Sequence, residues 1–126
     1  GFYSTEPKTM WEIDSIVDFM EEHYEEALAL CFKPIFGVTT DETDRQKFEH
    51  YFERMIPFLN DRLVSHGKKY IAGTNSLTIA DLKVYQTFIA LLEIETNPAP
   101  EDVKESVRMK ISQTSKLRNY LRELSA

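Results

Sequence analysis

The residues of this chain best suited to chemistry form a row of acidic side chains near its N-terminus. Asp14, Asp18, Glu21, Glu22 and Glu25 are spaced i, i+4, i+7, i+8 and i+11, which places them on one face of a helix. No Lys or Arg interrupts the row. Like charges one turn apart destabilise a helix by about 0.2–0.5 kcal/mol per pair. The row therefore predicts a cationic partner, and an ordinary solvated face is the alternative.

The other reactive side chains form no catalytic constellation by themselves. The sequence has no Gly-rich phosphate loop, no H-E-x-x-H and no paired C-x-x-C, and His23, His50 and His66 lack the spacing of metal ligands. No metal site is expected. Cys31 is predicted to be a small buried residue, because no nearby cation is evident to lower the pKa of its thiol. Tyr3 is predicted to be part of a linker that enters the first helix.

Helical periodicity covers most of the chain, and no segment has the pattern of a strand. Thr9-x-x-Glu12 has the spacing of a capping box at the start of the first helix. The second helix should be kinked at Pro57 and end at Gly67, which suits a left-handed cap. The predicted helices cover roughly residues 9–31, 40–66, 78–93, 103–111 and 115–124. The expected fold class is all-α, a bundle of about five helices.

The third helix carries the strongest local signal in the chain. Thr78-x-x-Asp81 has the spacing of a capping box, in which each side chain binds the backbone N–H of the other residue. Leu77 and Leu82 are placed to pack on each other as a hydrophobic staple. Since the helix is apolar nearly all the way round, it is predicted to lie in the middle of the core, where free amide groups need partners.

Length and composition bound the class of protein. With 126 residues, of which 42% are hydrophobic, the chain is predicted to form one domain over residues 1–126. Residues 1 to 63 hold 14 acids against 6 Lys and Arg, so most of the negative charge lies in the first half. No basic patch indicates nucleic-acid binding, and no apolar run is long enough to cross a membrane. One cysteine fits a reducing, cytoplasmic location. Gly1 in place of Met suggests a cut from a longer polypeptide.

The segment Gly73 to Leu82 resembles the capped core helix in the all-helical C-terminal domain of cytosolic glutathione transferases. The segment Ile13 to Glu22 is similar to the first helix of that domain, closest to the sigma class. This resemblance implies that an N-terminal thioredoxin-like domain, absent from this chain, carries the residue that stabilises the thiolate. It also implies a homodimer formed through the first two helices, reduced glutathione as a substrate and a small hydrophobic electrophile as the other.

The resemblance also assigns roles to residues. In the family, acids on the first helix approach the active site of the opposite subunit and hold the α-amino group of glutathione; here these are Asp18, Glu21 and Glu22. Two of them are Glu where the sigma-like pattern has Asp, which argues against a bound cation. Tyr24 and Leu28 are expected to line the pocket of the electrophile, although both also fit the core stripe. The chain contains no catalytic residue and is expected to be inactive alone.

Other functions fit the same helices. Domains of this shape serve as non-catalytic assembly modules in translation factors and synthetase complexes, and the capped helix would occur there too. A sigma-like isomerase or a ligand-storage protein such as a lens crystallin is a third possibility. The last two helices are polar and weakly patterned, which departs from the family.

Overall fold

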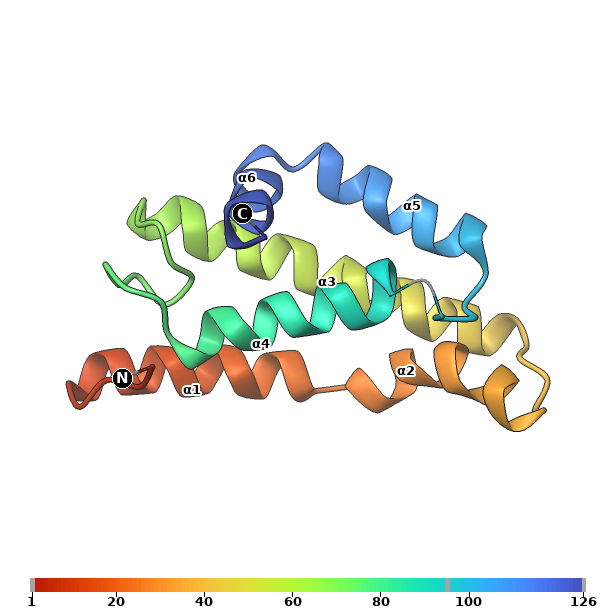
Figure 1. The fold of residues 1–126 in the computed structure, drawn as a ribbon. Helices are drawn as coiled ribbons and strands as arrows, with labels where there is room; N and C mark the ends of the chain where they lie inside the picture. The colour runs from red at the N-terminus through yellow and green to blue at the C-terminus, as the bar shows by residue number, and fades with distance from the viewer. Residues whose placement is uncertain (1, 95, 126) are drawn as a thin grey trace.

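The computed structural model describes residues 2–94 and 96–125, and these contain helices and no strand (Figure 1). The helices are α1 (Pro7–Glu21), α2 (Tyr24–Phe32), α3 (Glu42–His66), α4 (Ile79–Phe88), α5 (Glu101–Ser112) and α6 (Ser115–Leu124), with a 3₁₀ turn η1 (Lys33–Phe36) and a π-helical turn η2 (Ile89–Glu93). The predicted all-α class is confirmed. The described residues contain one α-helix more than the expected five because the first predicted helix is divided.

That division is the main correction to the predicted helices. α1 ends at Glu21, His23 adopts a left-handed φ of 64°, and α2 starts at Tyr24. A left-handed residue other than glycine is uncommon, and it ends a right-handed helix. The apolar period continues across the break because both helices bury their stripes in one core. The buried stripe consists of Ile13, Ile16, Met20, Ala27, Leu30 and Cys31.

α1 also starts earlier than the sequence predicted. The carboxylate of Glu6 accepts hydrogen bonds from the backbone N–H of Thr9, at 3.1 Å, and from its hydroxyl, so Glu6 is the N-cap. Pro7 takes the first helical position, where its missing N–H costs nothing. The predicted box between Thr9 and Glu12 is therefore wrong, and Glu12 instead forms an ion pair with Arg62 of α3 at 2.8 Å.

α3 is the longest helix and contacts α2, α5 and α6. It starts with a capping box between Asp41 and Asp44, whose two hydrogen bonds measure 3.0 and 3.1 Å. Lys33 of η1 lies 2.8 Å from the Asp44 carboxylate and lowers its pKa. The helix continues through Pro57 and ends at Gly67, which has a φ of 63°. The predicted second helix and its glycine cap are confirmed.

α4 begins with the predicted capping box, and the box is buried. Thr78 is 5% exposed and Asp81 is fully buried. The Asp81 Oδ2 atom accepts hydrogen bonds from the backbone N–H of Thr78, at 2.9 Å, and from its hydroxyl, at 3.2 Å. The Oδ1 atom accepts from the backbone N–H of Ile71 at 2.9 Å and from the hydroxyl of Tyr120 at 2.6 Å. One carboxylate thus joins the start of α4 to the preceding loop and to α6.

α4 is less buried than predicted. It packs on α1 and α6, but Ile79 and Leu82 remain 45% and 42% exposed. These two residues border a surface hollow beside Val17, whereas Leu77 lines a different hollow next to Tyr120. The prediction of a helix buried all round is therefore wrong on this face. Packing of Leu77 on Leu82 as a staple stays a prediction.

Aromatic side chains fill the centre of the bundle between α3 and α4. Phe52 contacts Phe48 and Phe88, with ring centroids 5.3 and 5.5 Å apart. The hydroxyl of the buried Tyr51 donates to the Met20 carbonyl at 2.6 Å, which joins α3 to the end of α1. Burying each such side chain contributes about 1.5–3 kcal/mol to folding. This core holds the ends of α1 and α2 in place.

Candidate functional site

The three acids expected to contact glutathione lie at the C-terminal end of α1, and all three are exposed. The Glu21 carboxylate forms an ion pair with Lys83 of α4. The Glu22 carboxylate lies 3.3 Å from the guanidinium of Arg54 on α3. Neighbouring helices therefore supply cations that the local sequence does not contain. The interpretation of the row as uncompensated charge is wrong at Glu21 and Glu22.

The other three acids of the predicted row, Asp14, Asp18 and Glu25, do not act as one charged face either. Asp14 accepts a hydrogen bond from the Tyr3 hydroxyl at 2.5 Å, and this bond raises the pKa of Tyr3. Glu25 follows the left-handed His23 and belongs to α2, so it does not continue the face of α1. The Asp18 side chain makes no hydrogen bond or ion pair with the described residues 2–94 and 96–125. Of the three acids expected to contact glutathione, Asp18 is thus the one without a side-chain partner among the described residues.

Tyr24 lies at the junction of α1, α2 and α4. The Lys83 Nζ atom lies 5.2 Å from the centroid of the Tyr24 ring, and Tyr51 contacts the same ring edge-on at 6.1 Å. Burial raises the pKa of Tyr24, and the charges of Cys31 and Glu21 add to this rise. Within the described part of the chain, the Tyr24 hydroxyl has no hydrogen-bond partner. Lys83 therefore joins Glu21 to Tyr24, the residue predicted to line the pocket.

Leu28 and Cys31 have structural surroundings. Leu28 is half-buried and packs against the core, which favours the core role left open by the sequence. Cys31 is 6% exposed, so the predicted buried position is confirmed. Burial raises the pKa of the Cys31 thiol, while the nearby Asn97 amide and the charge of Lys104 act in the opposite direction. Lys104 is distant from Cys31 in the sequence, so the sequence alone does not reveal it as a cation near the thiol.

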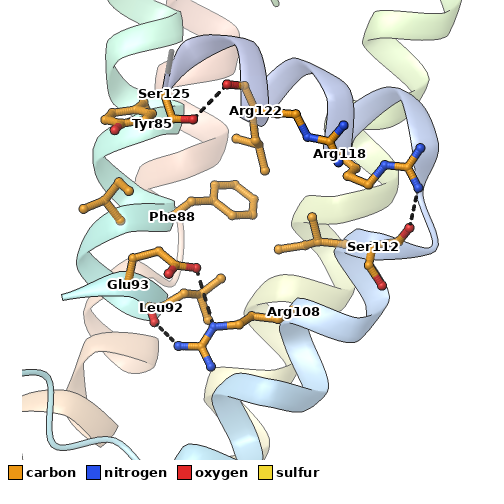
Figure 2. A pocket seen from close by; sticks show the side chains of 12 residues that line it. Tyr85, Phe88, Leu92, Glu93, Arg108, Ser112, Arg118, Arg122 and Ser125 are labelled. Carbon is orange, nitrogen blue, oxygen red and sulfur yellow. Dashed lines mark hydrogen bonds and ion pairs between the residues drawn. The ribbon is translucent and has the colours of Figure 1, made fainter. Parts of the chain in front are cut away.

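A pocket of about 570 Å³ lies between α4, η2, α5 and α6, and it is larger than the hollows beside Val17 and Tyr120 (Figure 2). None of the acids of α1, Tyr24 or Leu28 lines it. Its lining includes Arg108, Arg118 and Arg122, which sequence reasoning did not select. The available signal was the spacing of Arg118 and Arg122, four residues apart on one face of an amphipathic helix.

Among the described residues, no group of three or more His, Cys, Asp or Glu side chains is placed to hold a metal ion. No helix in the described segments is long and apolar enough to cross a membrane.

The fold is an all-helical domain in which helix α4 begins at a buried capping box formed by Thr78 and Asp81. A family model described as "Glutathione S-transferase, C-terminal domain" matches residues 31–123. The chain therefore belongs to this family. The match leaves out α1 and most of α2, where the predicted contacts to glutathione lie. No curated protein and no solved structure gave a significant match.

Proposed function

We propose that this chain is the helical domain of a sigma-like, cytoplasmic glutathione transferase that conjugates reduced glutathione to hydrophobic electrophiles. The family match over residues 31–123 carries the proposal. The proposed enzyme also contains a thioredoxin-like domain, which supplies the residue that stabilises the thiolate. The helical domain supplies the wall of the pocket and contacts in the dimer.

Asp18 is the proposed ligand of the glutathione amine. Of the three predicted acids, Glu21 and Glu22 already pair with Lys83 and Arg54, whereas Asp18 has no partner among the described residues. A carboxylate that is not already neutralised gains more from a cationic amine. Glu21 then positions Lys83 against Tyr24, whose hydroxyl stays available to the second substrate.

A surface of α1 and α3 supports the proposed homodimer through the first two predicted helices. Phe19 and Phe58 stack with centroids 3.8 Å apart and an interplanar angle of 12°. Arg54 lies 4.8 Å from the Phe19 ring, and Arg62 lies 5.0 Å from the Phe58 ring. The Arg54 Nη1 atom is buried without a hydrogen-bond partner in the described part of the chain. Aromatic and arginine side chains are enriched in protein interfaces.

The test uses the proposed full protein, in which this chain is joined to a thioredoxin-like domain. We expect retention on immobilised glutathione and conjugation of chlorodinitrobenzene, whereas the 126-residue chain alone should show neither. Turnover by the chain alone would contradict the proposed division of labour. A full protein without glutathione binding or activity would favour the alternative, a non-catalytic assembly module.

The role of Asp18 is tested by Asp18→Asn, with Glu25→Gln as the matched control. Both replacements remove one exposed carboxylate near the same helix junction. Asp18→Asn should raise KM for glutathione about tenfold, as expected when one charge-assisted contact is lost, with kcat little changed. Glu25→Gln should leave both constants unchanged. Equal KM values for the two variants would remove Asp18 from the glutathione site.

A further inference from the structure

The pocket between α4, η2, α5 and α6 has an apolar floor (Figure 2). Phe88 and Leu92 point into it and are only 4% and 2% exposed. Tyr85, Ile89, Ile111 and Leu121 contribute further apolar surface. Its volume, about 570 Å³, falls within the roughly 300–1,000 Å³ of ordinary ligand pockets. The pocket can therefore take a ligand with an extended apolar body.

At one end of the pocket, the positive charge of Arg108 is paired with carboxylates. The Arg108 guanidinium donates to the Leu92 carbonyl and to Glu101, the latter at 2.7 Å. Its Nε atom lies 3.5 Å from the carboxylate of Glu93, the acid among the lining residues. Arg108 also pairs with Glu105 at 3.1 Å. Arg108 and Glu93 thus tie α5 to η2, and this end of the pocket offers no unpaired positive charge to an anion.

The other end carries uncompensated positive charge. Arg118 and Arg122 come from α6 and lie toward the end of the pocket opposite Arg108 (Figure 2). Arg118 donates to the Ser112 carbonyl at 3.0 Å and to the Asn119 side chain at 3.4 Å, both neutral groups. In residues 2–94 and 96–125, no carboxylate forms an ion pair with Arg118 or Arg122.

From this arrangement we propose that the pocket binds a long-chain carboxylate, with the chain on Phe88 and Leu92 and the carboxylate at Arg118 and Arg122. The apolar floor favours an alkyl chain at about 0.8 kcal/mol per buried CH₂. A guanidinium binds a planar carboxylate through two parallel hydrogen bonds, which fixes which end of the ligand faces α6. A ligand with a neutral head group would gain no ion pair with Arg118 or Arg122, and a ligand with a cationic head group would be repelled by them. The site is separate from Tyr24 and the acids of α1.

The test measures binding of laurate to the 126-residue chain by calorimetry, below the critical micelle concentration. Dodecyltrimethylammonium, with the same chain and the opposite charge, and butyrate, with the charge and little chain, are the comparison ligands. We expect laurate to bind at least tenfold more tightly than either. In a ¹H–¹⁵N correlation spectrum, laurate should shift the amides of Phe88, Leu92, Ile111 and Leu121.

The double variant Arg118→Gln, Arg122→Gln should weaken laurate binding about tenfold, the loss expected for one charge-assisted contact. Lys116→Gln is the matched control, because Lys116 is exposed on the same helix and does not line the pocket. Thermal melts establish that the variants fold. Laurate binding that is no tighter than that of the cation, that ignores the double variant, or that shifts amides elsewhere would overturn the proposal. Since the readout is binding to the chain alone, failure of transferase activity leaves this test unaffected.

Discussion

The buried carboxylate of Asp81 and the exposed carboxylates of Glu21 and Glu22 are stabilised in opposite ways. Asp81 is fully buried and accepts four hydrogen bonds from neutral donors, without an ion pair in the described part of the chain. Glu21 and Glu22 at the end of α1 are exposed and lie beside Lys83 and Arg54. A buried carboxylate depends on fixed donors because water cannot replace them, whereas an exposed one keeps its water. Loss of a partner should therefore matter much more at Asp81.

The largest effect is expected for Asp81→Ala. The change leaves the N–H groups of Ile71 and Thr78 and the hydroxyl of Tyr120 without their acceptor inside the core. Each buried donor left unsatisfied costs about 1–3 kcal/mol, so the free energy of unfolding should fall by about 3 kcal/mol or more. Urea unfolding followed by circular dichroism measures this. Asp81→Asn, which keeps one acceptor oxygen, should lose less; equal losses would mean that the hydrogen bonds are not what matters.

Tyr120→Phe removes one of the four donors and should cost about 1 kcal/mol. It should also change the pH dependence of stability. Burial, together with the nearby Asp81, raises the pKa of Tyr120 in the folded protein above the ordinary value of 10. Below pH 10 both states hold the proton, whereas above it the unfolded state loses the proton first, so stability falls as pH rises.

The slope contributed by Tyr120 should approach about 1.4 kcal/mol per pH unit. Thermal melts between pH 9 and 11 should therefore show a shallower decline for Tyr120→Phe than for the original chain. The remaining decline is assigned to the other groups whose pKa burial raises, which are Tyr51, Tyr24 and Cys31. Parallel curves for the two proteins would show that Tyr120 ionises as readily in the folded state as in the unfolded one.

A smaller effect is expected for Lys83→Gln. The Lys83 side chain is 17% exposed and that of Glu21 is 53% exposed, so solvent screens the pair. Exposed pairs contribute about 0.2–1 kcal/mol, and this variant should lose no more than that at low salt. The loss should shrink further in 1 M salt, where charges are screened over about 3 Å. A loss that persists in salt would point to the stem of Lys83 packing on Tyr24.

The smallest effect is expected for Asp18→Asn. Asp18 is exposed and has no side-chain partner among the described residues, so its replacement should change the free energy of unfolding by less than about 0.5 kcal/mol. The same urea titration that is used for Asp81 measures this. A neutral effect on stability, combined with a raised KM for glutathione, would separate function from folding at this position.

Local signals predicted much of the fold, and contacts between distant segments account for the rest. The Thr78 and Asp81 box and the end of α3 at Gly67 depend on residues within one turn, so spacing reveals them. The break at His23 has no Gly or Pro to mark it, and the apolar period continues across it. The partnership of Glu21 with Lys83 joins α1 to α4, which only the packed bundle brings together.

The same limit applies to both candidate sites. Asp18, Glu21 and Glu22 look alike in the sequence, and only the positions of Lys83 and Arg54 distinguish them. The arginines of the larger pocket belong to α5 and α6, whereas Phe88 and Leu92 in its floor belong to α4 and η2. Spacing along one helix cannot reveal a pocket that three helices build.

The arrangement of the helices depends on the number of residues in the π-helical turn η2. A π turn holds one residue more than an α-helical turn needs. The helix ends with this turn, so its last carbonyls have no partner within the helix: those of Ala90 and Leu91 accept from the side chain of Asn97, at 3.0 and 2.9 Å, and that of Leu92 accepts from Arg108. Deleting a single residue from 89–93 would let the helix end in a regular α-helical turn and would move these carbonyls relative to Asn97 and Arg108. The hydrogen bonds that fix the entry to α5 would then have to form anew.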